Sequence, residues 1–290
     1  MTNKIFNTTA IIFAVAILVL SSCSQYQKLL KSDDVMLKKQ KAIEFYEKGD
    51  YTRSIGLLTN IIPVFRGTIH AENLNYYWAK AHFQLGDYVL AGSYFESFVL
   101  GFPRSVHVEE FLFLSAYCKY LLSPRPSLDQ TPTREAIAGF QRFINRFPNS
   151  PRVEEANNLI DELRLKMEIK VLESARLFFN IRDYTAAIRT FNNLIRDFPD
   201  TDFREEAMYM IMRSHYLHAV NSIEIRQLER YRNAVEAHRR LLNRFPESQF
   251  TESAQRMLED SQLQINRLEQ AENLRKAQAQ QEGTGAETNR

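Results

Sequence analysis

The chain has 290 residues, of which 44% are hydrophobic and 25% are charged, and its formal net charge at pH 7 is +2. This share of apolar residues is enough for a buried core, so the composition excludes a chain that is disordered throughout. The small net charge gives no basic footprint of the kind that nucleic-acid-binding domains carry. We therefore expect no nucleic-acid partner.

Residues 1–22 have the pattern of an export signal. Lys4 gives the segment a basic start, and residues 11–20 form one continuous apolar run. A helix that spans a bilayer needs about 20 apolar residues, so this run is too short to cross a membrane and fits the core of a signal peptide. The sequence predicts a signal peptide over 1–22.

The signal ends in LSSC, with Cys23 as its last residue. This tetrapeptide resembles the lipobox of bacterial lipoproteins, which implies cleavage before Cys23 and attachment of diacylglycerol and an N-acyl chain to that cysteine. Such lipids hold a folded domain on a membrane without a spanning helix. Since Ser24 stands where an inner-membrane retention signal of enteric bacteria has Asp, we expect an anchor in the outer membrane that faces the periplasm, with 23–33 as the lipidated linker. An ordinary secretory signal with Cys23 as a free thiol remains the alternative.

A Phe-Pro corner occurs four times, about 45 to 51 residues apart, as expected for stacked helical hairpins. Proline ends the preceding helix because it lacks an N–H group and crowds the turn before it. A hydroxyl residue two positions after each proline can cap the next helix. Paired glutamates near the start of the first three of these helices complement the helix dipole. The four hydroxyl residues are Ser105, Ser150, Thr201 and Ser248.

Within the repeats, Gly-Asp-Tyr or Arg-Asp-Tyr marks the turn between two helices. Small, aromatic and proline residues then follow at the offsets of a tetratricopeptide (TPR) repeat. These patterns predict an all-α, TPR-like superhelical solenoid of about five helix pairs plus a C-terminal helix near 250–278. The first helices are expected near 34–48, 71–85, 106–122, 152–181 and 202–220, and the second helices near 52–65, 88–101, 132–146, 184–197 and 228–244.

The repeats divide into an N-terminal group over 34–150 and a C-terminal group with its capping helix over 151–276. Residues 277–290 are polar and predict a disordered tail. Residues 121–133 contain three prolines and predict a long loop, of the kind that is more often functional or mobile than structural.

No catalytic or nucleotide-binding motif occurs in the sequence. Cys118 lies in an apolar helix and is expected to be a small core residue. His215 and His218 share a helix face, but they lack further ligands nearby in the sequence, and a structural zinc site needs four. We predict a protein that is not an enzyme and has neither a metal nor a cofactor apart from the lipid.

One face of the first helices is the candidate peptide groove. Aromatic and basic side chains there could hold an extended peptide by an aromatic side chain and a terminal carboxylate. The alternative is that the aromatic side chains pack between neighbouring repeats. The candidate residues are Lys39, Tyr46, Tyr76, Lys80 and Phe83.

The lipobox, the TPR-like pairs, the corners such as RDFPDT at 196–201 and the long last helix together resemble the BamD lipoproteins of the outer-membrane β-barrel assembly (Bam) machinery. The resemblance implies a non-catalytic scaffold that binds the barrel protein BamA through its C-terminal repeats and unfolded outer membrane proteins through its N-terminal repeats. Arg196 and Asp197 are the candidate contacts with the POTRA domains of BamA, although Arg196 is equally explained as a favourable cation at a helix C-terminus. The alternative function is that of another periplasmic TPR lipoprotein, acting as a cell-envelope adaptor.

Overall fold

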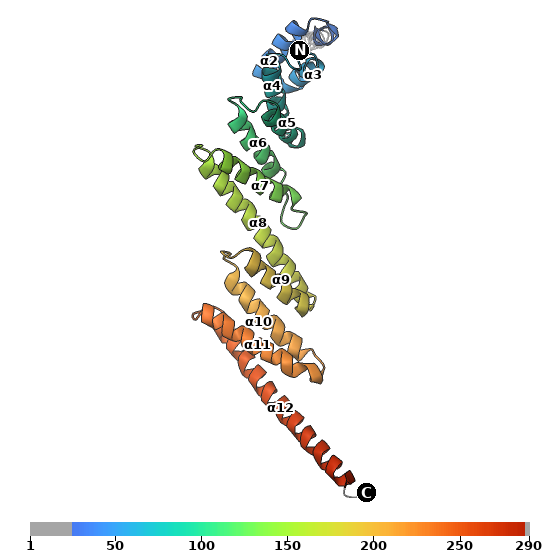
Figure 1. Cartoon of the computed structure of the whole chain (residues 1–290), viewed down its shortest axis with the longest axis vertical. Coiled ribbons are helices and arrows are strands. Elements are labelled where there is room, and N and C mark those ends of the chain that lie inside the picture. The colour runs from blue at the N-terminus through green and yellow to red at the C-terminus, as the bar shows by residue number, and fades with distance from the viewer. Residues whose placement is uncertain (1–24, 288–290) are drawn as a thin grey trace, which may run out of the picture. The chain divides into compact units, whose positions relative to one another are not determined.

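The computed structural model describes residues 25–287, with side chains through residue 278, and this part of the chain is helical without strands (Figure 1). Cys23 lies outside the described residues. A short helical segment over 25–31 comes first. In chain order the helices that follow are α2 (Val35–Glu47), α3 (Tyr51–Ile61), α4 (Ala71–Gln84), α5 (Tyr88–Gly101), α6 (Val108–Leu121), α7 (Thr131–Arg146), α8 (Val153–Asn180), α9 (Tyr184–Asp197), α10 (Arg204–Val220), α11 (Glu224–Arg244) and α12 (Thr251–Glu287).

These helices form five consecutive pairs, α2 with α3 through α10 with α11, and α12 follows them. The predicted all-α, TPR-like solenoid is confirmed. Helix α3 ends at Ile61, earlier than predicted, since Pro63 follows and the chain then turns. Among the described residues, no helix combines the length and the apolar character that crossing a membrane requires.

Helix α12 runs to Glu287, past the residue 276 at which we expected the capping helix to end. The segment 277–287 is therefore helical in the structure, where the sequence predicted a disordered tail. Residues 277–282 are Ala, Gln and Glu, which are good helix formers, so their polarity does not oppose the helix.

The turns inside the helix pairs use left-handed backbone. Gly49 and Gly86 have φ of 78° and 79°, and Arg182 takes the same place in a later turn with φ of 65°. Glycine adopts this conformation at little cost, whereas a residue with a Cβ atom is strained in it. Three turns of one geometry thus contain two glycines and one arginine.

The hydroxyl residues of the four corners make one recurring hydrogen bond. Each side-chain oxygen accepts from the backbone N–H two residues on, at 3.1 Å for Ser105, 3.2 Å for Ser150, 3.2 Å for Thr201 and 3.1 Å for Ser248. Because each following helix begins three residues after the hydroxyl residue, these side chains organise a turn that leads into the helix. They are not the N-cap residues that the sequence predicted.

The chain divides into two compact units, residues 1–164 and 165–290, and the boundary falls inside α8. The sequence analysis placed it at the corner between 150 and 151 instead. The first part of α8 belongs to the core of the first unit through Ile160 and Leu163, whereas Leu172 and Ala175 belong to the core of the second. One helix of 28 residues therefore contributes to both cores.

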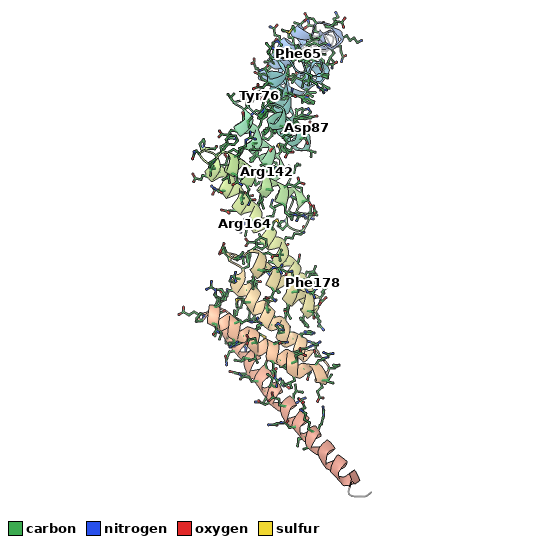
Figure 2. The ribbon with its side chains drawn as sticks, in the orientation of Figure 1. Phe65, Tyr76, Asp87, Arg142, Arg164 and Phe178 are labelled. Atoms are coloured by element: carbon green, nitrogen blue, oxygen red, sulfur yellow. The ribbon has the colours of Figure 1, made fainter. Side chains whose placement is uncertain are left out.

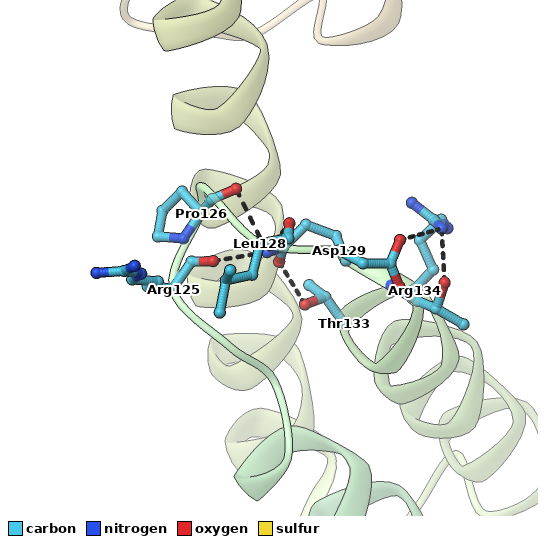
Figure 3. Close-up of polar contacts among 8 residues, drawn as sticks. Arg125, Pro126, Leu128, Asp129, Thr133 and Arg134 are labelled. Atoms are coloured by element: carbon cyan, nitrogen blue, oxygen red, sulfur yellow. Dashed lines mark hydrogen bonds and ion pairs between the residues drawn. The ribbon is translucent and has the colours of Figure 1, made fainter.

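The proline-rich segment before α7 is held together by one buried side chain (Figure 3). Gln130 is fully buried, and its amide nitrogen donates to the carbonyl oxygens of Arg125 at 2.9 Å and Leu128 at 3.1 Å. Its amide oxygen accepts from the Thr133 hydroxyl at 2.6 Å. Gln130 thus makes hydrogen bonds on both sides of the turn, and these bonds define the path of the backbone. The sequence analysis expected this segment to be a functional or mobile loop.

The helical segment over 25–31 packs onto the first helix pair, in the region that we expected to be a linker. The Tyr26 ring makes an edge contact with Phe45, with 5.9 Å between ring centroids, and its hydroxyl donates to the Arg53 carbonyl oxygen at 3.2 Å. Gly56 makes room for Tyr26, because a Cβ atom at Gly56 would collide with the tyrosine hydroxyl. The chain is thus fixed to the first repeat within three residues of Cys23.

Candidate interaction surfaces

Half-buried aromatic side chains follow the first helices of the first unit, on α2, α4 and α6. We name this feature the aromatic strip. It contains three of the predicted groove residues and three that the prediction did not include. Its members are Tyr46, Tyr76, Tyr77, Phe83, Tyr117 and Tyr120.

The strip connects neighbouring repeats by ring contacts. Tyr46 of α2 meets Tyr77 of α4 at 5.0 Å between centroids. Tyr76, which Figure 2 labels on the first unit, stacks on Phe111 of α6 at 5.3 Å and 9°. Phe83 reaches Tyr117 of α6 at 6.4 Å. These contacts match the alternative of packing between repeats, and the exposed parts of the same rings leave an aromatic surface.

The predicted basic residues of the groove are engaged. The Lys80 ammonium lies 2.7 Å from a carboxylate oxygen of Glu110, and the Lys80 side chain is only 17% exposed. The Lys39 ammonium lies 2.9 Å from the His70 ring nitrogen Nδ1. Because Glu110 already compensates the charge of Lys80, a peptide carboxylate at this position has to compete with Glu110.

Two phenols of the strip, those of Tyr46 and Tyr76, are held in their neutral form. Burial, with a smaller effect of neighbouring groups such as Tyr76, raises the pKa of Tyr46 to about 12. Burial and the Glu110 carboxylate raise the pKa of Tyr76. Neutral phenols combine apolar ring faces with hydroxyl groups that donate and accept hydrogen bonds. The strip therefore suits aromatic side chains and peptide backbone better than it suits charged groups.

Arg196 and Asp197 pair with each other at the end of α9. The Arg196 guanidinium donates to the two Asp197 carboxylate oxygens at 2.8 and 3.3 Å, and Asp197 raises the pKa of Arg196. The two side chains are 71% and 47% exposed. Arg196 also lies in the last turn of α9, where a cation favours the helix dipole. The pair is accessible to a partner, and the geometry fits both explanations of Arg196.

The structure adds one recurring contact that the sequence analysis missed. Lys80 of α4 pairs with Glu110 of α6, and Arg176 of α8 pairs with Glu206 of α10, with donors and acceptors 30 residues apart in both cases. The sequence analysis assigned the paired glutamates at these helix starts to the dipole alone. The constant separation between a cation and the next helix's second glutamate was the signal that could have revealed these ties between repeats.

The remaining candidates for chemistry are one cysteine and two histidines. Cys118 is fully buried, and burial raises the pKa of its thiol to about 12, as expected for a core cysteine. His215 and His218 line a cavity together with Arg226 and Glu229. Over the residues with described side chains, no group of three or more His, Cys, Asp or Glu side chains is arranged to hold a metal ion.

Residues 38–222 match the model of a protein family described as YfiO, outer membrane lipoprotein. The outer membrane protein assembly factor BamD of Haemophilus influenzae is 21% identical over 214 residues, which cover 70% of this chain and 81% of that protein. BamD of Caulobacter vibrioides is 20% identical over 226 residues, covering 75% and 74%. Among solved structures, the TPR domain of P58(IPK) aligns over 83% of this chain and 68% of that chain, with 13% identity and a TM-score of 0.39.

Proposed function

This chain belongs to the YfiO family of outer membrane lipoproteins, and from that premise we propose that it is an outer membrane protein assembly factor. On this proposal it is a non-catalytic scaffold of a Bam complex, which binds a BamA-like barrel protein and assists the folding and insertion of outer membrane proteins. The observation that carries the proposal is the family match over residues 38–222, together with curated BamD relatives that align over most of their own length.

The anchor is the lipid on Cys23, in the outer membrane and on its periplasmic side. Tyr26 packs against Gly56, so only two residues lie between Cys23 and a residue that is fixed to the first repeat. This packing supports a short tether. A diacylated and N-acylated cysteine gives stable membrane attachment. The anchor then holds the first repeat close to the membrane surface.

The aromatic strip is the surface that we assign to unfolded outer membrane proteins. Its rings offer apolar contact area at low cost in side-chain entropy, and their hydroxyl groups can pair with peptide backbone. The pair of Lys80 with Glu110 argues that ring contacts, rather than a captured carboxylate, supply the affinity. Tyr46, Tyr76 and Phe83 are the candidate anchors, with Lys39 and Lys80 at the edge.

The end of α9 is the surface that we assign to the BamA-like partner. Arg196 is exposed, and among the described residues it pairs only with Asp197, so a partner carboxylate can exchange with Asp197 at small cost. Such exchange gives orientation and a faster encounter more than it gives affinity.

The test is a pull-down from solubilised outer membrane with the C-terminally tagged full chain. We expect enrichment of a POTRA-containing barrel protein, and loss of that protein with Arg196→Glu. The double variant Arg196→Glu with Asp197→Arg keeps an internal ion pair of reversed polarity, so it separates partner contact from local pairing. Barrel recovery that stays low in the double variant supports contact through Arg196.

Arg146→Glu is the matched control, because Arg146 is an exposed cation in the last turn of α7 in the first unit, one residue nearer to its corner phenylalanine than Arg196 is. It removes the same favourable interaction with a helix end but should leave barrel recovery unchanged. If every variant recovered the barrel protein, the proposed function would stand, but Arg196 would not be a contact with the barrel protein. Absence of the barrel from the wild-type pull-down, with another envelope protein enriched, would favour the cell-envelope adaptor.

A further inference from the structure

A groove runs over α10 between α9 and α11 in the second unit. Side chains of α10 that recur every three or four residues form its floor, so they lie on one face of the helix. The groove contains two cavities, of about 280 and 150 Å³. The floor residues are Arg204, Met208, Ile211, His215 and His218.

Cationic side chains dominate this groove. Arg226 and Arg230 of α11 line the larger cavity, and Arg204 and Arg240 line the smaller one. Glu229 is the one carboxylate residue among the residues that line the two cavities. The groove therefore has an excess of positive charge that a bound group of opposite charge can neutralise.

None of these arginines forms a short-range ion pair with a carboxylate within the described part of the chain. The pKa of Glu236, which is lowered mainly by its hydrogen bond from Arg239, is also lowered by the nearby charge of Arg240. The Arg230 guanidinium donates to the Ser222 hydroxyl, and Arg204 donates to the carbonyl oxygens of Ile195 and Pro199. Elsewhere on α11, by contrast, Arg232 pairs with Glu269 at 2.7 Å and Arg239 pairs with Glu236 at 2.8 Å. The arginines that face the groove thus differ from those that face away from it.

The histidines of the floor add hydrogen-bonding groups rather than charge at neutral pH. Burial, with a smaller effect of Arg240 and His218, lowers the pKa of His215 to about 4. Burial and Arg230 lower the pKa of His218, while Asp183 opposes this effect. Neutral imidazole offers one donor and one acceptor, so the net charge of the groove comes from its arginines.

We propose that this groove binds an extended acidic segment of a partner polypeptide. Guanidinium groups pair with carboxylates through two parallel hydrogen bonds, which favours Asp and Glu side chains as ligands. From Arg204 to His218 the rise along α10 is about 21 Å, which an extended segment of about six residues spans. Met208 and Ile211 lie between the cationic ends and fit apolar side chains that alternate with the acidic ones.

The apolar centre distinguishes a polypeptide from a lipid headgroup, which carries phosphate without an alternating apolar side chain. Arg196 and Asp197 line neither cavity, although the smaller cavity reaches their neighbour Ile195. The inference does not depend on the proposed function, since it concerns any partner with such a segment.

The test is fluorescence anisotropy with the full chain in detergent and a labelled eight-residue peptide of alternating Glu and Leu. We expect saturable binding that weakens at least about tenfold in the double variant Arg226→Ala with Arg240→Ala, which removes two charges from exposed positions. A peptide with Gln in place of Glu should bind as weakly. Arg232→Ala is the matched control on the same helix, because its partner Glu269 lies on α12 and lines neither cavity. We expect its affinity to stay within about twofold of wild type.

Circular dichroism of each variant checks that the helices are intact. Equal binding of the Glu and Gln peptides, or full affinity of the double variant, would overturn the proposal. Dihexanoyl phosphatidylglycerol serves as a competitor. If it bound in an Arg226- and Arg240-dependent way while the peptide did not bind, the groove would be a lipid site and the proposal would be wrong.

Discussion

The two units repeat the same helix pair, but the last pair of the second unit fills one buried position differently from the pairs before it. Seven residues before the phenylalanine of each corner, three pairs carry Phe95, Phe140 and Phe191, and all three side chains are fully buried. The last pair carries His238 there, 7% exposed, with its ring nitrogen Nε2 buried and without a hydrogen-bond partner. The frame of the repeat thus tolerates a polar ring in the core of the second unit.

The surfaces of the two units also differ, and the second unit again has the more polar side chains. The first helices of the first unit carry the aromatic strip, whereas α10 of the second unit forms the floor of a cationic groove. The left-handed turn residues are Gly49 and Gly86 in the first unit and Arg182 in the second. The comparison shows that the repeat pattern sets the positions of the helices. A different residue at the buried phenylalanine position or at the left-handed turn gives each unit its own chemistry and stability.

The largest expected effect comes from the shared phenylalanine position. Phe140→Ala and Phe191→Ala should each cost about 3–5 kcal/mol, because each leaves a cavity in a fully buried site. We expect the first to raise hydrogen exchange mainly in α6 and α7, and the second mainly in α9 and α10, since the two residues belong to separate cores. Hydrogen exchange with mass spectrometry measures both.

Leu100→Ala is the control, because Leu100 is 81% exposed and its truncation should leave exchange unchanged. Equal acceleration in both units after either phenylalanine substitution would show that the units unfold together. That outcome would contradict the division of stability inferred from the two cores.

The next effect is a gain. His238→Phe restores the residue of the other repeats and removes a buried nitrogen without a partner, so we expect a stabilisation of about 1–3 kcal/mol. The reciprocal variant Phe191→His should lower stability, since it creates the same defect in the preceding pair. Urea denaturation of both variants gives the free energies of unfolding. A loss of stability in His238→Phe would mean that the larger ring does not fit.

Because His238 is buried, we also expect the stability of the fold to depend on pH. Burial lowers the pKa of His238 below its ordinary value of 6.5, and the pKa of His215 is lowered to about 4. Above pH 6.5 both groups are neutral in the folded and unfolded chain, so the stability is complete there. As the pH falls below 6.5, the unfolded chain binds protons first, and stability is lost down to about pH 4.

His238→Phe should therefore make the loss of stability below pH 6.5 less steep. Above pH 6.5 this substitution should not change how stability depends on pH. Thermal unfolding followed by circular dichroism between pH 4 and 8 measures this slope. A slope that stays the same in the variant would assign the acid sensitivity to other groups.

Much of the fold follows from local rules in the sequence. The prolines at 103, 148, 199 and 246 each follow the end of a helix, because proline lacks an N–H group and crowds the preceding turn. The helix pairs and their order could therefore be predicted. The division inside α8 could not, since it depends on which core each turn of one continuous helix contacts.

The candidate surfaces were predictable only in part. Helical spacing placed Tyr76 and Phe83 on one face, but their stacking partners Phe111 and Tyr117 come from another helix. The pairing of Lys80 with Glu110 likewise depends on the distance between repeats. The cationic groove escaped the sequence analysis because its arginines come from α10 and α11, and only packing brings them together.

The smallest effect concerns the turn that carries Arg182. Arg182→Gly removes left-handed strain of about 1–2 kcal/mol and adds about 0.4–1 kcal/mol of unfolded-state entropy, so we expect a net gain of about 0.5–1 kcal/mol. Arg182 is exposed and makes no side-chain hydrogen bond or ion pair in the described structure, so the substitution removes little else. Gly49→Ala is the matched opposite and should lose a similar amount, since nothing lies within 4 Å of a Cβ atom at that position. If urea denaturation found Arg182→Gly less stable than wild type, the arginine would have a stabilising role in the second unit that backbone strain does not describe.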